Sequence, residues 1–109
     1  MTSYLLIESR DPFESRDERF VEETALALRE RGREVTVFLV QNGVLACRKL
    51  ARGTYLGRLE QAGVTLLADD FSLRERGIRI EEMHPGVQPS SIEALVDHLA
   101  QEKTKAIWH

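Results

Sequence analysis

The chain has few of the features that mark secreted, membrane-spanning or zinc-binding proteins. It contains 1 cysteine, 3 prolines and 1 tryptophan among 109 residues. A single cysteine forms no internal disulfide and supplies no structural zinc site alone. No apolar run approaches the roughly 20 residues that span a bilayer, and no charged segment precedes a long apolar stretch at the start. These absences predict a cytoplasmic protein with no membrane partner.

Charge of one sign is not concentrated anywhere in the chain. The 18 acidic and 15 basic residues are interleaved and give a formal net charge of -3. Without a basic stripe, nucleic acid is not an expected partner. His84, His98 and His109 stand far apart, without the spacing that mounts two metal ligands on one helix face. We expect them at surface or loop positions, and we expect neither a metal site nor a cofactor.

Length and composition suit one small globular domain. The chain has 109 residues, of which 42% are hydrophobic and 30% are charged. This size supports a single hydrophobic core and not two. We therefore expect one domain spanning residues 1–109.

Short apolar runs are the main signal of secondary structure. Nearly continuous runs are typical of strands that are covered on both faces, as in parallel sheets. They occur at 4–7, 35–40, 64–68 and 105–108. The segment 79–90, "RIEEMHPGVQPS", contains two prolines and a glycine, so extended or loop structure is expected there.

Helical periodicity fills the gaps between these runs. Segment 16–32 carries an apolar stripe, with Ser15 and Glu18 spaced as a capping box and Gly32 as a stop signal. Segment 90–103 repeats the pattern, with Ser90 and Glu93 as its capping box. Shorter helices are expected at 44–51, 54–62 and 71–76.

Alternation of strands and helices predicts the fold class. It is typical of a three-layer α/β/α sandwich with a mainly parallel sheet, here of four or five strands. We expect the runs 35–40 and 64–68 at its centre. Ligands of such sheets collect beyond the carboxyl ends of the strands, which directs attention to residues 8–16, 41–43 and 69–71.

All three of these loops carry candidate binding residues. Asp69 and Asp70 either cap the next helix or, joined by Asp11, hold a cation or act as a base. Gln41, Asn42 and Gly43 form either an ordinary turn or a contact loop. In the contact loop, Asn42 and Gly43 take positive φ and leave their amides pointing outward.

The single cysteine, Cys47, has two interpretations. Free cysteines are among the most buried residues, and the neighbouring sequence "GVLAC" suggests a packed helix. A position in the first turn of that helix, followed by Arg48 and Lys49, would instead lower its pKa and make it reactive.

The order of motifs resembles one known family. "LLIESRDPFES", "VTVFLVQNGVLAC", "LEQAGVTLLADDFSLRERGI", "SIEALVDHL" and "AIW" follow the layout of the DsrE/DsrF/DsrH family of sulfur-relay proteins with the YchN-like fold, over essentially the whole chain. The resemblance implies a doubly covered parallel sheet, cytoplasmic assemblies that are often trimers or hexamers, and persulfide transfer through a cysteine with donor or acceptor proteins.

The resemblance also implies where the sulfur-carrying cysteine belongs. In carrier members it follows the third strand, and counting back from the "RGI" at 76–78 places Asp69 at that position. Aspartate lacks the sulfur that attacks and leaves in thiol exchange. We therefore expect a non-catalytic or binding member of the family. The alternatives are a sulfur carrier that uses Cys47 and an assembly subunit of a larger complex.

Overall fold

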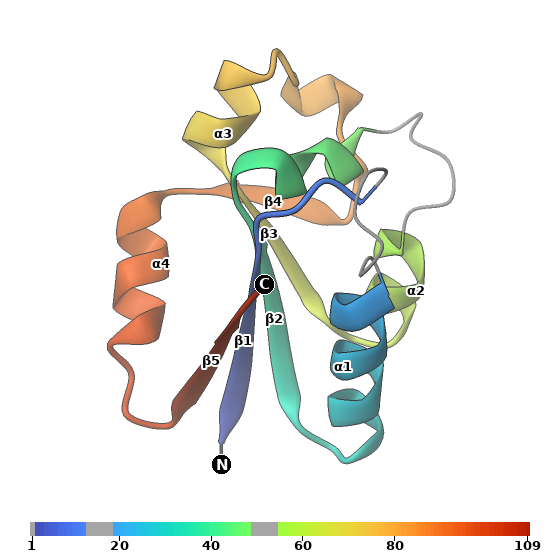
Figure 1. The fold of residues 1–109 in the computed structure, drawn as a ribbon, viewed down its shortest axis with the longest axis vertical. Helices are drawn as coiled ribbons and strands as arrows, with labels where there is room; N and C mark the ends of the chain where they lie inside the picture. Colours follow the sequence, from blue (N-terminus) through green and yellow to red (C-terminus); the bar gives the residue numbers. More distant parts are fainter. Residues whose placement is uncertain (1, 13–18, 49–54) are drawn as a thin grey trace.

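The computed structural model describes residues 2–12, 19–48 and 55–109, which form a five-stranded sheet with helices on both faces (Figure 1). Every neighbouring pair is parallel, in the order β4-β3-β2-β1-β5. This confirms the predicted sandwich, with the second and third strands adjacent and away from the sheet edges. The strands are β1 (Ser3–Glu8), β2 (Glu34–Leu39), β3 (Thr65–Asp69), β4 (Val87–Ser90) and β5 (Thr104–Trp108).

One face of the sheet is covered by α1 (Arg19–Glu30) and α2 (Leu56–Gln61) (Figure 1). Helix α1 turns Val21 and Ala25 into the larger of two apolar clusters, as its periodicity predicts. It ends at the expected stop signal: Gly32 has φ 74 and donates its N–H to the Arg29 carbonyl.

The opposite face is covered by α4 (Ile92–Leu99) (Figure 1). Leu95 of this helix packs against a smaller apolar cluster that includes Leu5, Ile7 and Phe38. Helix α3 (Asp70–Glu75) follows β3 directly and lies over the carboxyl ends of the strands. Two 3₁₀ helices, η1 (Gln41–Cys47) and η2 (Ile80–Glu82), complete the described structure.

Several boundaries differ from the sequence predictions. The helix expected at 44–51 is the 3₁₀ helix η1, which begins at Gln41 directly after β2 and ends at Cys47. Helix α4 is capped by Ser91 and not by Ser90, because Ser90 is held in β4 opposite Asp69. The capping pair Ser15 and Glu18 and the segment 49–54 lie outside the described residues.

Strand β4 occupies part of the segment predicted as extended or loop. It contains Pro89, which has no backbone N–H to donate. Proline is tolerated in a strand at the edge of a sheet, and β4 is an edge strand.

Candidate functional site

A hydrogen-bonded side-chain network lies where β2 and β3 end. Asp69 caps α3: its Oδ2 accepts from the Ser72 backbone N–H at 3.0 Å and from the Ser72 hydroxyl at 2.6 Å. The Ser72 Oγ in turn accepts from the Gln41 backbone N–H at 2.9 Å. The capping role proposed for Asp69 is therefore present in the structure, and it links the two neighbouring strand ends.

Asp69 also has an oxygen that takes no part in the cap. The residue is only 6% exposed, and its Oδ1 has no hydrogen-bond partner among the described residues. Buried polar atoms are rarely left without a partner, since the lost hydration costs about 1–3 kcal/mol. Such an atom needs a hydrogen-bond donor, which a bound water or a ligand would supply.

A cavity of about 250 Å³ adjoins this carboxylate. Gln41 and Asp69 line it at the strand ends, and apolar or aromatic side chains from α3, α4 and β5 form much of the remaining wall. The apolar and aromatic wall residues are Val40, Phe71, Ile92, Leu95 and Trp108. An apolar cavity with a few polar groups, beyond the carboxyl ends of parallel strands, is the usual form of a small-molecule site.

The other two candidate aspartates are not part of this wall. Asp70 is the first residue of α3 and is half-buried, and Asp11 is half-buried in the loop after β1. Neither appears among the described lining residues of the cavity. Within the described parts of the chain, no group of three or more His, Cys, Asp or Glu side chains could hold a metal ion.

The loop 41–43 differs from the contact loop considered for it. Gln41 is the residue with positive φ, at 51°, because the chain turns there from β2 into η1. The amide of Gly43 does not point outward but donates to the Val40 carbonyl at 2.9 Å. The side chain of Asn42 accepts from both Nε and Nη2 of Arg76. Of the three loop residues, only Gln41 therefore lines the cavity.

Gly43 has a different role from the one its sequence context suggested. It is buried, and a Cβ at this position would lie 2.1 Å from the backbone oxygen of Glu8. The absence of a side chain lets η1 pack directly on the end of β1. That contact keeps the ends of β1 and β2 close together.

Cys47 is fully buried. It is 0% exposed within the larger apolar cluster, and it is the last residue of η1 and not in a first helical turn. Burial raises the pKa of its thiol to about 12. Among the described residues, no helix begins at this sulfur, and the thiolate is disfavoured at neutral pH.

Sequence reasoning missed a buried acid–base pair on the α1 side of the sheet. Glu8, at the end of β1, lies 2.6 Å from Nδ1 of His109, and the His109 ring stacks on Phe20 of α1. His109 lies just after β5, outside the regular elements, which fits the expected surface or loop position, but its side chain is only 13% exposed. The available signal was a polar residue at the end of each of two apolar strands.

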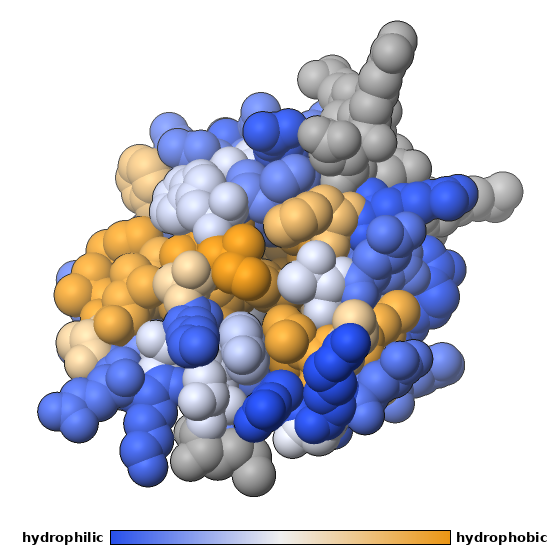
Figure 2. All heavy atoms as spheres, turned by 60° about the horizontal axis from the view of Figure 1, so that its bottom comes forward, coloured by the Kyte–Doolittle hydropathy of each residue, from blue (hydrophilic) through white to orange (hydrophobic). Residues whose placement is uncertain are grey.

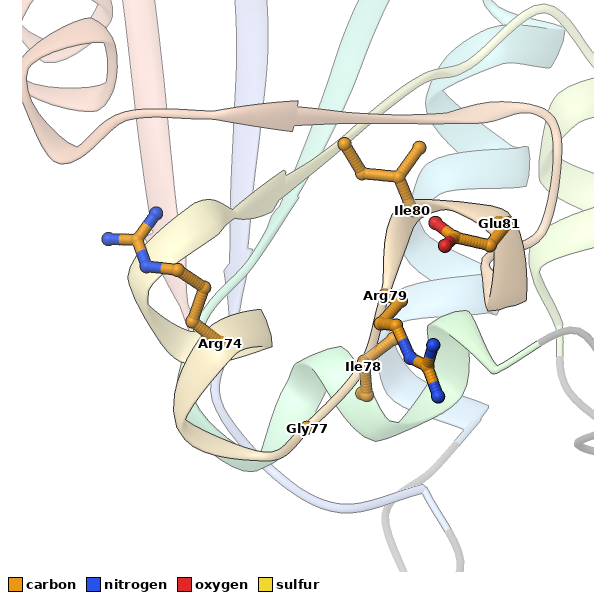
Figure 3. A pocket seen from close by; sticks show the side chains of 6 residues that line it. All are labelled: Arg74, Gly77, Ile78, Arg79, Ile80 and Glu81. Carbon is orange, nitrogen blue, oxygen red and sulfur yellow. The ribbon is translucent and has the colours of Figure 1, made fainter.

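A second cavity of about 470 Å³ lies between α3 and η2 (Figure 3). It is lined by two arginines, Arg74 and Arg79, but their guanidinium groups lie on opposite sides and do not point toward one another (Figure 3). The Nε of Arg79 instead lies 3.2 Å from Oε1 of Glu82. Because its polar groups do not converge, this cavity is a weaker candidate than the one at Asp69.

None of the helices in the described part of the chain is long and apolar enough to cross a membrane. No curated protein matches the chain in sequence.

Solved structures show the same fold. YchN from E. coli superposes with a TM-score of 0.76 and 20% identity, covering 98% of this chain and 100% of its own. MTH1491 from Methanobacterium thermoautotrophicum, described as a protein of unknown function, gives a TM-score of 0.77 and 20% identity, covering 99% and 98%. The sequence profile of the DsrE/DsrF-like family matches residues 2–106, and the chain therefore belongs to that family.

Proposed function

We propose that the chain is a DsrE-like protein that carries no sulfur on a thiol and acts in the cytoplasm by binding a small molecule at the Asp69 cavity. Membership of a family related to sulfur relay supports the DsrE-like part of this proposal. The observation that carries the proposal is the environment of Cys47, the single cysteine of the chain.

Persulfide transfer needs an accessible thiolate, because the thiolate is the attacking group in sulfur exchange. Cys47 offers neither property, since it is fully buried and its pKa is raised to about 12. The position that the family resemblance assigns to the carrier is Asp69, whose carboxylate is committed on one oxygen to capping α3. The chain retains a cavity at the strand ends but not the thiol chemistry.

Sulfur loading tests the proposal directly. The protein is incubated with a low-molecular-weight persulfide donor, and its intact mass is measured before and after reduction. We expect no reducible addition of sulfur to the folded protein. Addition of a sulfur atom that is absent from Cys47→Ser would overturn the proposal. That variant is expected to lose about 1 kcal/mol of stability and to remain folded.

A second candidate function, assembly with further subunits, is favoured by the outer surface of α4. Only Leu95 of this helix is buried, whereas Ile92, Val96 and Leu99 are exposed, as is Trp108 on the edge strand β5. Hydrophobic side chains gather on the side of the molecule where α4 lies (Figure 2, left). We call Ile92, Val96, Leu99 and Trp108 the α4–β5 patch; two of them, Ile92 and Trp108, also line the Asp69 cavity. Exposed apolar clusters of this kind often mark subunit interfaces.

A further inference from the structure

We infer that the Asp69 cavity selects a small amine, with its cationic nitrogen at Asp69 and its apolar body against the aromatic wall. This inference rests on the proposed binding function and adds the chemical class of the ligand. The observation that starts it is the unpartnered Oδ1 of a carboxylate that is only 6% exposed and lines the cavity.

The charge of the cavity wall favours a cation. Two carboxylates, Asp69 and Glu75, belong to the wall, and none of its described residues is basic. The Oε1 of Glu75 lies 4.0 Å from Nη1 of Arg76. Asp69 has no basic side chain within ion-pair distance among the described residues. An ammonium group would supply both a hydrogen-bond donor for Oδ1 and a counter-charge.

The aromatic wall favours the same ligand class. Phe71 of α3 and Trp108 of β5 are 58% and 63% exposed, although both line the cavity. Indole and phenyl faces attract cations and stack on flat apolar groups. With Ile92 and Leu95 they provide a surface for the apolar body of the ligand.

The size of the cavity limits the ligand to a small molecule. Its volume of about 250 Å³ lies below the roughly 300–1,000 Å³ of sites that hold drug-sized ligands. A single ring with a short aminoalkyl arm is of suitable size. Benzylamine is a probe of this class, and benzyl alcohol and benzoate are its neutral and anionic analogues.

The chain carries its own reporter for the test, because Trp108 is its single tryptophan and lines the cavity. Each probe is titrated at matched ionic strength while tryptophan emission is recorded. We expect saturable binding of benzylamine, binding of benzyl alcohol at least about ten-fold weaker, and still weaker binding of benzoate. Equal binding of benzylamine and benzyl alcohol would show that the carboxylate does not select the ligand and would overturn the inference.

Two neighbouring aspartates provide a matched pair of variants. Asp69→Asn removes the charge but keeps a side chain that can cap α3, so the fold is expected to persist. Asp70→Asn removes a charge one residue away that does not line the cavity. We expect benzylamine affinity to fall about ten-fold or more in Asp69→Asn only, with benzyl alcohol binding unchanged in both. An equal loss in both variants, or no loss in Asp69→Asn, would contradict the inference.

The comparison of the three probes on the unaltered protein does not depend on how well the variants fold. Failure of the amine preference with no sulfur loading at Cys47 would reject the ligand class but not the non-carrier function. Sulfur loading at Cys47 would reject the non-carrier function whatever the amine titration shows.

Discussion

Cys47 places an ionisable group where water does not reach, and this has a consequence for stability at alkaline pH. Burial raises the pKa of the thiol from 9.0 to about 12 in the folded state. Between these values the folded chain keeps a proton that the unfolded chain releases, so the free energy of unfolding falls as pH rises. Tyr55 acts in the same direction, because burial and the charge of Glu8 raise its pKa.

We predict that the free energy of unfolding falls above pH 9 and that Cys47→Ala makes the fall shallower. One such group contributes a slope of at most about 1.4 kcal/mol per pH unit. Urea unfolding of both proteins at several alkaline pH values measures the difference. Identical slopes would show that Cys47 is not shielded from solvent.

A thiol introduced at the strand end provides a second prediction. Asp69→Cys places sulfur beside two donors, the backbone N–H and the hydroxyl of Ser72, that now serve the Asp69 carboxylate. Donors of this kind favour a thiolate. With Cys47→Ala as the background, the new cysteine should react with a thiol probe at neutral pH much faster than Cys47 does in the unaltered protein. Faster labelling of Cys47 would reverse the roles assigned to the two positions.

The 3₁₀ helix η1 depends on one residue, Gly43. A Cβ on Gly43 would lie 2.1 Å from the Glu8 carbonyl oxygen, and neither backbone can yield without separating η1 from β1. We predict that Gly43→Ala costs more than about 2 kcal/mol of stability. Gly57→Ala is the control: it lies in α2, and its Cβ would meet its nearest neighbour, His84, at 3.9 Å.

The control variant should gain about 0.5–1 kcal/mol, since alanine favours a helix over glycine. Thermal or urea unfolding of both variants gives the comparison. A Gly43→Ala protein as stable as the unaltered chain would mean that the contact between η1 and β1 is not required.

Strands and long helices could be predicted from the sequence because their patterns are local. Each apolar run, in β1, β2, β3 and β5, and the apolar stripe of α1 lie within one short continuous segment of the sequence. The cap of α4 could not, because Ser90 and Ser91 are chemically equal and only pairing of Ser90 with Asp69 in the sheet distinguishes them. The same limit applied to η1, whose start depends on the contact of Gly43 with β1.

The candidate site could be predicted only in part, for a similar reason. The rule for strand ends identified Asp69 and Gln41, which the structure brings together through Ser72. The aromatic wall combines α3 with β5, and periodicity gives no information on which distant elements meet. The pair formed by Glu8 and His109 joins residues 101 positions apart, so no local motif predicts it.

For the whole molecule, the α4–β5 patch predicts self-association. Its side chains are exposed on the described surface although they are large and apolar, and water contact with such a surface is unfavourable. We predict a trimer or hexamer at micromolar concentration, measured by light scattering. Val96→Asp should shift the mass toward the monomer with the helix content unchanged.

The neighbouring position provides the control for that change. Asp97→Ala alters the charge of the same exposed helix without adding a polar group to the patch, and it should leave the measured mass unaltered. A monomeric mass for the unaltered chain would show that the patch does not mediate assembly.

The position of β1 between β2 and β5 has a consequence for how the chain is synthesised. Ser3 pairs with Glu34 on one side and with Thr104 on the other. At about 5–20 residues per second, a ribosome completes β2 several seconds before it supplies α4 and β5. During that interval Leu5, Ile7 and Phe38 have no cover on the α4 side of the nascent sheet. The emerging chain therefore presents a bare apolar surface until its last elements are made.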